Sequence, residues 1–440
     1  MFASSLSPAS FASLDCSDYW PPTFMCYPTS RGSSGLVRAM GRSHPMNTTD
    51  QTPPEAPVPG TQPHSPRMLE LDGVRGIAII LVLLTHLFSY TMLGRVWHGF
   101  PKFVLNVTLF GWLGVDLFFI LSGFLITGIL FDSKGAPHYF RDFYARRALR
   151  IFPLYLAVLA FLFFFRTNSG PFVLCGLLMA TNLVSLFGIP ETPGGEALWS
   201  LSVEEHFYLI WPWVIRNSTP LTATAISVLL CIAEPMVRAY WRFSVYDVYS
   251  YSWFRLDGLA WGALVALFVR GGGKSRQVAL RAAAVAACLA VAVAVIGSPF
   301  GILHRGNRLG AALQFSLPEM LFASLVMFTV TMAGSRFTAV LRSRVLTLFG
   351  DLSYCLYVIH LIVMNEVDAL LGRFLDVQKA LNSFGFVCVR AFLVLLICLV
   401  VAYISRRYFE LPILSLKRYF TPPSEAKSQL VPGAERAPTT

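Results

Sequence analysis

Residues 69–86 read LELDGVRGIAIILVLLTH, an apolar stretch with charges near its start and a histidine at its end. A helix needs about 20 predominantly apolar residues to cross a bilayer, so this stretch is long enough to form most of one span. Ionisable residues are rare within spans because a charge at the centre of a membrane is costly. The stretch therefore predicts a membrane helix in which Asp72, Arg75 and His86 are functional candidates.

The composition extends the membrane assignment to most of the chain. Of its 440 residues, 55% are hydrophobic and 13% are charged, and the mean hydropathy is +0.59. Soluble domains carry about 25% charged residues. The net charge of +11 arises from Lys and Arg in short loops between apolar runs, which is typical of cytoplasmic loops in membrane proteins. We expect an all-α, polytopic transmembrane helical bundle and no nucleic-acid partner.

Eleven apolar segments are candidates to cross the membrane. They are 74–93, 108–131, 151–166, 171–189, 199–215, 221–239, 256–270, 279–297, 317–334, 346–370 and 385–404. Four basic stretches need a side of the membrane: 141–150, 270–281, 336–344 and 406–417. With a cytoplasmic N-terminus, all four are cytoplasmic only if one segment before residue 270 does not cross. We therefore expect about ten spans plus one re-entrant or interfacial segment, with both termini cytoplasmic.

Two of the eleven segments are the weakest candidates for a span. The segment 199–215 contains two glutamates and a histidine, and the segment 256–270 is short and follows Arg255. Each of these features disfavours a lipid-exposed span. We expect one of these two segments to be the one that does not cross.

The two ends of the chain differ in composition from the rest. Residues 1–67 are rich in Ser, Pro, Thr and Gly and lack a long apolar run, so they do not resemble a signal peptide. We expect 1–67 to be a disordered cytoplasmic tail and 421–440 to be a second one. Met46 and Met68 are alternative starts, so the first 67 residues could also reflect a wrongly assigned start.

The spacing within the first span suggests a site. Asp72 and Arg75 are three residues apart and can pair on one helical face. His86 follows Arg75 by eleven residues, about three turns or about 16 Å, which places it on the same face near the membrane midplane. Histidine has an unperturbed pKa suited to proton transfer. The alternative is a histidine that only forms a hydrogen bond with a neighbouring helix.

Two further residues lie in the apolar segment 111–130. Asp116 needs a partner because a buried carboxylate is costly. Ser122 and the adjacent Gly123 could line a cavity or could simply allow close helix packing.

Polar side chains also occur in two later segments. Glu204 and Glu205 lie in 197–212, where they need arginine partners or a polar cavity, and structural pairing is a serious alternative to function. Tyr354, Tyr357 and His360 lie along one predicted helix, with cavity lining and plain packing both open.

Three arginines precede the third span: Arg146, Arg147 and Arg150. They can act as a cytoplasmic anchor under the positive-inside rule. They can also bind phosphates, as guanidinium groups do. Because coenzyme A carries several phosphates and is cytoplasmic, this is where its binding site is expected.

Other kinds of site lack support. The eight cysteines are scattered and form no CxxC motif or Cys/His cluster, and no two histidines have i, i+3 or i, i+4 spacing. The sequence contains no GxSxG, HExxH or P-loop motif. We therefore expect no metal site.

Six ordered blocks carry a family resemblance. They are LDGVRGIAIILVLLTH at 71–86, GVDLFFILSGFLI at 114–126, RRALRIFPLY at 146–155, LWSLSVEEHFYLIWP at 198–212, RLDGLAWGALVA at 255–266 and LSYCLYVIHLIV at 352–363. With these blocks the chain resembles the acyltransferase-3 family over about residues 68–420. That family includes O-antigen and exopolysaccharide O-acetyltransferases.

The resemblance implies an acyltransferase of about ten spans in the bacterial inner membrane, in contact with membrane lipids. It implies acetyl-CoA or another acyl-CoA as co-substrate, no bound cofactor, and a carbohydrate or glycolipid acceptor. His86 is then catalytic with Arg75 beside it, and Asp72 orients Arg75. Whether His86 accepts the acyl group or acts as a general base stays open.

Two alternatives to a sugar acyltransferase remain. The first is a transmembrane acyl or proton-coupled transporter, because intramembrane His, Asp and Arg also mark proton relays. The second is acyl transfer to a small-molecule acceptor such as a macrolide.

Overall fold

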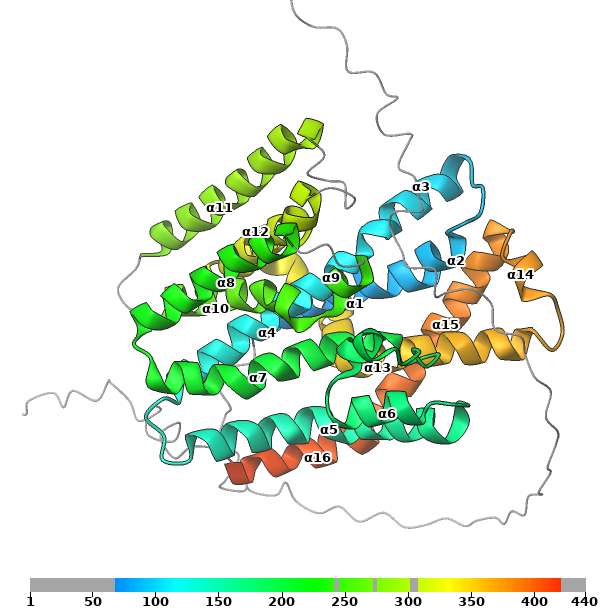
Figure 1. Ribbon diagram of the computed structural model, residues 1–440, viewed down its shortest axis with the longest axis horizontal. Helices are drawn as coiled ribbons and strands as arrows, with labels where there is room; N and C mark the ends of the chain where they lie inside the picture. The colour runs from blue at the N-terminus through cyan, green and yellow to red at the C-terminus, as the bar shows by residue number, and fades with distance from the viewer. Residues whose placement is uncertain (1–67, 241–244, 272–274, 301–307, 421–440) are drawn as a thin grey trace, which may run out of the picture. The chain divides into compact units, whose positions relative to one another are not determined.

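The computed structural model describes residues 68–240, 245–271, 275–300 and 308–420 (Figure 1). All regular secondary structure in these residues is helical, which confirms the all-α class. The expected tails, 1–67 and 421–440, lie outside the described residues.

Sixteen α-helices follow one another along these ranges. They are α1 (Leu69–Leu84), α2 (Tyr90–Met92), α3 (Gly99–Thr108), α4 (Leu113–Asp132), α5 (Tyr139–Phe165), α6 (Gly170–Leu177), α7 (Trp199–Asn217), α8 (Pro220–Tyr240), α9 (Val245–Ser250), α10 (Leu256–Arg270), α11 (Arg276–Gly297), α12 (Arg308–Thr331), α13 (Arg344–Leu371), α14 (Val377–Ala380), α15 (Phe384–Ile404) and α16 (Leu411–Ser415). Eight helical stretches of the described residues are long and apolar enough to cross a membrane. They are built from α1–α2, α3–α4, α5, α8, α11, α12, α13 and α15–α16. The polytopic helical class is confirmed, with eight such stretches against the ten expected.

Helices α7 and α10 are not among the eight, yet both run alongside α4. Two ion pairs join these helices, one near each end of α4. Asp116 pairs with Arg255, the residue before α10, and Asp132 pairs with Arg270 at 2.9 Å. Helix α7 is likewise joined to α4 by hydrogen bonds from Ser122 to Glu204 and from Trp211 to Thr127, each 2.8 Å long. Both helices therefore run in the same direction as α4 and alongside it. With them, ten helical elements of the described ranges run through the bundle.

The segment 171–189 is not a continuous helix, and its prediction as a span was wrong. Helix α6 ends at Leu177, Met179 has a left-handed φ of 53°, and a 3-10 segment follows at Thr181–Phe187. The hydroxyl of Thr181 lies 2.8 Å from that of Ser202, and Asn182 donates to Ser252 at 2.9 Å. These bonds hold the turn inside the protein. The segments 199–215 and 256–270, expected to be the weakest spans, form α7 and α10, and neither is among the eight candidate spans.

Two glycines allow helices to touch along their backbones. A Cβ atom at Gly123 of α4 would lie 1.9 Å from the carbonyl oxygen of Leu259 in α10. A Cβ atom at Gly350 of α13 would lie 1.9 Å from the carbonyl oxygen of Asp72 in α1. No side chain fits at such distances, so these glycines allow both helix pairs to pack this closely. Small residues commonly have this function in membrane bundles.

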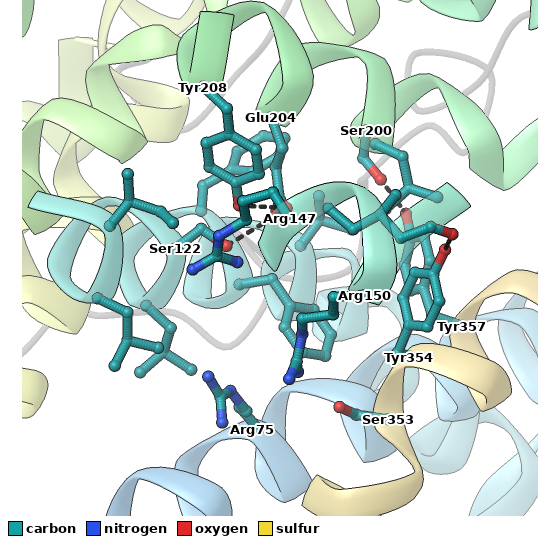
Figure 2. Close-up of a pocket in the computed structure, with 18 residues that line it drawn as sticks. Arg75, Ser122, Arg147, Arg150, Ser200, Glu204, Tyr208, Ser353, Tyr354 and Tyr357 are labelled. Atoms are coloured by element: carbon teal, nitrogen blue, oxygen red, sulfur yellow. Dashed lines mark hydrogen bonds between the residues drawn. The ribbon is translucent and has the colours of Figure 1, made fainter. Parts of the chain in front are cut away.

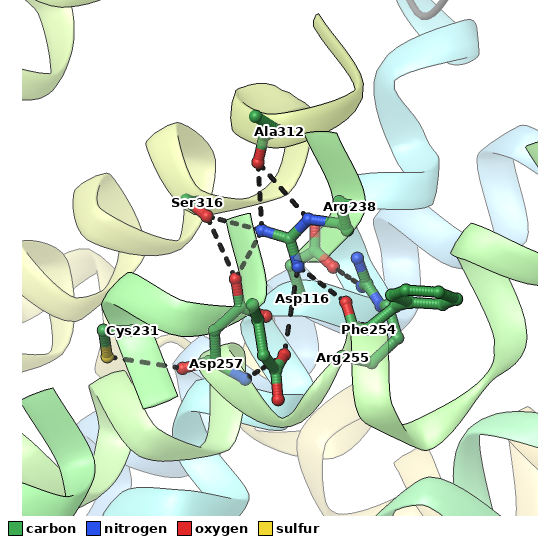
Figure 3. Close-up of polar contacts among 9 residues, drawn as sticks. Asp116, Cys231, Arg238, Phe254, Arg255, Asp257, Ala312 and Ser316 are labelled. Carbon is green, nitrogen blue, oxygen red and sulfur yellow. Dashed lines mark hydrogen bonds and ion pairs between the residues drawn. The ribbon is translucent and has the colours of Figure 1, made fainter. Parts of the chain in front are cut away.

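A buried network of charged side chains joins α4, α8, α10 and α12 (Figure 3). Arg238 of α8 donates to Asp257 and to Ser316, each at 2.6 Å. Arg255 pairs with Asp116, and both side chains are completely buried. Each guanidinium therefore has a carboxylate partner, which a charge inside a membrane protein requires.

The two ion pairs between α4 and α10 form a matched experiment. Asp116 is completely buried, whereas the side chain of Asp132 is 58% exposed. Asp116→Ala leaves Arg255 as an unpaired buried charge and should lower the free energy of unfolding by about 3–5 kcal/mol. Asp132→Ala should cost less than about 1 kcal/mol, as is usual for exposed pairs. Thermal and denaturant unfolding of both variants in detergent measures the difference, and equal losses would contradict the assignment.

Candidate functional site

A pocket opens between α1, α4, α5, α7 and α13 (Figure 2). It holds about 780 Å³ of empty space, including the part open to solvent. Its lining residues are Arg75, Val115, Phe118, Phe119, Leu121, Ser122, Leu125, Ile126, Arg147, Arg150, Ile151, Ser200, Leu201, Glu204, Tyr208, Ser353, Tyr354 and Tyr357. The pocket thus combines a charged region, an apolar wall and a group of hydroxyls.

Three arginines supply the positive charge of the pocket. Arg75 is held by Asp72 through a 3.0 Å ion pair, which confirms the pairing expected from their spacing. Arg147 and Arg150 come from one face of α5, and the guanidinium of Arg147 lies 5.3 Å from the centre of the Tyr208 ring. Glu204 is the only carboxylate among the lining residues. The lining therefore has an excess of positive charge, which suits an anionic ligand.

The carboxylate of Glu204 is fully engaged. Ser122 donates to one oxygen and Tyr208 to the other, each at 2.8 Å. The hydrogen bond to Glu204 fixes the Tyr208 ring, on which the guanidinium of Arg147 packs. Glu204 therefore joins lining side chains of α4 and α7 through hydrogen bonds.

Hydroxyl groups gather on the α13 side of the pocket. The hydroxyls of Ser200 and Tyr357 lie 2.6 Å apart and join α7 to α13. Tyr354 donates to the carbonyl of Ile151 at 2.6 Å and joins α13 to α5. These bonds fix the tyrosine rings, so this side of the pocket is preformed.

Two histidines meet beyond Tyr357. The ring centroids of His86 and His360 are 4.7 Å apart with the planes at 69°, and the Tyr357 ring lies 5.9 Å from that of His360. Neither histidine is among the lining residues, whereas Tyr357, which packs on His360, is. His86 belongs to a π-helical segment, Thr85–Ser89, and such bulges are frequent at functional sites.

The hydrogen bonds of the two histidines fix their tautomers. Nδ1 of His86 is 2.8 Å from the carbonyl oxygen of Val82, and Nδ1 of His360 is 2.8 Å from that of Tyr357. A carbonyl oxygen only accepts, so each Nδ1 carries a proton. In the neutral rings, each Nε2 atom therefore has a free lone pair, and this lone pair can act as a nucleophile or as a base.

A loop with two acidic residues lies farther along α13. Gly194 of this loop packs against Ile362, two residues beyond His360, and its N–H donates to Glu196 at 2.7 Å. Burial raises the pKa of Glu196 to about 7, and burial with the nearby carboxyl of Glu196 raises the pKa of Glu191 to about 8. This loop therefore holds protons near neutral pH.

The sequence-based candidates divide between the pocket and its surroundings. Six of them line the pocket: Arg75, Ser122, Arg147, Arg150, Glu204 and Tyr354. Six do not: Asp72, His86, Asp116, Arg146, Glu205 and His360. Asp72 and His360 each contact a lining residue, His86 packs on His360, and Asp116 belongs to the network of Figure 3.

The prediction omitted three polar lining residues, namely Ser200, Tyr208 and Ser353, whereas Tyr357 was among the residues considered for cavity lining. Two of the three were accessible to sequence reasoning. Tyr208 follows Glu204 by four residues, so it shares a helical face with a candidate. Ser353 precedes Tyr354 directly. Ser200 has no comparable signal.

Comparison with known proteins agrees with this architecture. A family described as an acyltransferase domain matches residues 68–403. Over 195 residues the chain is 30% identical to YrhL, a putative peptidoglycan O-acetyltransferase of Bacillus subtilis, covering 39% of this chain and 28% of that protein. It is also 30% identical over 162 residues to OatA, a peptidoglycan O-acetyltransferase of Listeria monocytogenes, covering 32% and 23%.

A third relative is the O-acetyltransferase OatA of Staphylococcus aureus, 30% identical over 174 residues, or 34% of this chain and 25% of that protein. The matched parts thus span about a quarter of the length of these relatives. No solved structure matches the chain significantly. Because the family match extends over residues 68–403 of 440, the chain belongs to the acyltransferase-3 family.

Proposed function

We propose that this protein is a membrane O-acetyltransferase that transfers an acetyl group from cytoplasmic acetyl-CoA to a hydroxyl of a carbohydrate acceptor. The observation that carries the proposal is the convergence of Arg75, Arg147 and Arg150 on one pocket beside a pair of histidines. Membership of the acyltransferase-3 family supports the reaction class.

The residues that line the pocket suit the successive parts of an acyl-CoA. Guanidinium groups bind phosphates through paired, charge-assisted hydrogen bonds, so the three arginines suit the phosphates of the donor. The apolar wall, with Phe118 and Leu125 among its members, suits the pantetheine arm. The thioester then lies toward Tyr357, near the histidines.

His86 is the catalytic residue of this proposal. Its Nδ1–H donates to the carbonyl of Val82, which orients the ring and leaves the Nε2 lone pair free to react. That lone pair can attack a thioester carbonyl carbon. Asp72 keeps Arg75 in place on the same helix.

The distribution of basic residues supports cytoplasmic termini. Arg342 pairs with Glu70 at 2.7 Å, so the basic segment Arg336–Arg342 lies at the start of α1. Basic segments face the cytoplasm in most membrane proteins. The donor pocket, which includes Arg75 from the second turn of α1, then opens toward the side where acetyl-CoA occurs.

The nature of the acceptor rests on the relatives. Two of them are named for peptidoglycan, a carbohydrate polymer. We propose a glycan or glycolipid hydroxyl on the outer side of a bacterial inner membrane as the acceptor. O-antigen and other exopolysaccharides belong to the same chemical class.

A transporter is the second candidate function, because the protein buries ion pairs such as Asp116–Arg255 within its helices. Purified protein in nanodiscs, given acetyl-labelled acetyl-CoA, separates the two. Release of CoA thiol together with labelled protein or labelled glycan supports the enzyme. Uptake of substrate into vesicles without thiol release would contradict it.

The arginines provide a graded test of the donor site. Arg147→Gln and Arg150→Gln should each raise KM for acetyl-CoA about 10- to 100-fold, because a hydrogen bond to a charged group contributes about 1.5–3 kcal/mol. Arg146→Gln is the matched control, since it removes the same charge from the same helix but not from the pocket lining. We expect it to change KM less than about threefold, as for a screened surface charge.

Steady-state thiol release measures all three KM values. Equal effects of the three substitutions would mean that the arginines act only through overall charge. That outcome would contradict the pocket as the donor site.

A further inference from the structure

His360 has a property that the donor pocket does not explain. Its side chain is 1% exposed, and its Nε2 atom has no hydrogen-bond partner among the described residues. Buried polar atoms are nearly always paired, because an unpaired one loses its hydration without compensation. The unpaired Nε2 of His360 therefore indicates that this atom binds a group from outside the protein.

The orientation of His360 is held independently of that lone pair. Its Nδ1–H is directed at the carbonyls of Tyr357 and Leu356, 2.8 Å and 3.2 Å away, both on its own helix. Rotation of the ring to pair Nε2 would break these bonds. The helix thus keeps Nε2 unprotonated and available.

Among the described residues, the histidine that contacts this ring is His86. The two rings come from α13 and from the π-helical segment after α1, and their centroids are 4.7 Å apart. Both have the same tautomer, so neither can donate a proton to the other in the neutral state. Two acceptor lone pairs cannot satisfy each other, but the two packed rings can act together on one small group placed beside them.

We propose that His360 is a second catalytic residue, which takes the proton of the acceptor hydroxyl while His86 carries the acetyl group. This assignment rests on the proposed function and divides its chemistry into two steps. The division gives each Nε2 lone pair one task, nucleophile for His86 and general base for His360.

The two steps balance as follows. In the first, Nε2 of His86 bonds to the thioester carbonyl carbon, the carbon–sulfur bond breaks, and its electron pair leaves with the CoA thiolate. In the second, the acceptor oxygen bonds to the same carbon, the carbon–nitrogen bond breaks, and its pair returns to Nε2 of His86. The hydroxyl proton passes to Nε2 of His360 and from there through water to the thiolate. One thioester and one alcohol become one ester and one thiol.

The two histidines can be separated without knowledge of the natural acceptor. Water serves as the hydroxyl acceptor, and hydroxylamine serves as a nucleophile that attacks without a general base. Wild type, His86→Gln, His360→Gln and His360→Asn are mixed with labelled acetyl-CoA in nanodiscs. Thiol release, acetylated protein by mass spectrometry and the decay of the label are followed in a single turnover.

We expect His360→Gln and His360→Asn to form acetyl-protein as fast as the wild type, within about threefold. Its hydrolysis by water should be about 100-fold slower, the lower end of what a general base contributes. Hydroxylamine should remove the label from the wild type and from both His360 variants at equal rates. Tyr90→Phe is a control, since Tyr90 also packs on His86, at 4.6 Å, yet supplies no base. It should behave as the wild type.

Two results would overturn the role of His360. One is wild-type hydrolysis in both His360 variants, and the other is loss of acetyl-protein formation in variants whose thermal unfolding matches the wild type. A wild type that releases no thiol, or a His86→Gln variant that is acetylated at the wild-type rate, would instead overturn the proposed function itself.

Discussion

The buried ion pair between Arg255 and Asp116 allows the central helix α4 to carry a carboxylate inside a membrane bundle. An unpaired carboxylate at this position would be strongly disfavoured. The pair also fixes where α10 begins, since Arg255 directly precedes that helix. Together with the contact of Gly123 against Leu259, it sets the register of the two parallel helices. The face of α4 that carries Ser122 is then turned toward α7 and the pocket.

A second close contact positions the chemistry. Gly350 brings the backbone of α13 against that of Asp72 in α1, three residues before Arg75. Farther along, His360 of α13 meets His86 of the π-helical segment that follows α1. The hydroxyl pair of Ser200 and Tyr357 adds α7 to this framework. The site is therefore assembled by helix contacts rather than by a mobile loop.

Some of this could be predicted from the sequence, for identifiable physical reasons. Apolar runs and basic loops predict the helical membrane class, and a three-residue spacing predicts the Asp72–Arg75 pair. Residues 171–189 were misjudged because hydropathy does not reveal that Thr181 and Asn182 make inward hydrogen bonds.

The position of each polar side chain in the folded protein was harder to predict. Arg146 and Arg147 are neighbours of equal charge, and only the packing of α5 against α7 decides which one lines the pocket. Asp116 needed a partner, but that partner is 139 residues away in sequence. Such long-range pairings depend on helix arrangement, which a single sequence does not contain.

The most direct test of the account is an experimental structure of the protein in nanodiscs with a non-hydrolysable acetyl-CoA analogue. The account predicts phosphate density on Arg147 and Arg150, and the acyl end of the analogue beside Tyr357 and within reach of Nε2 of His86. Donor density on another face of the bundle, or an acyl end directed away from the histidine pair, would contradict it.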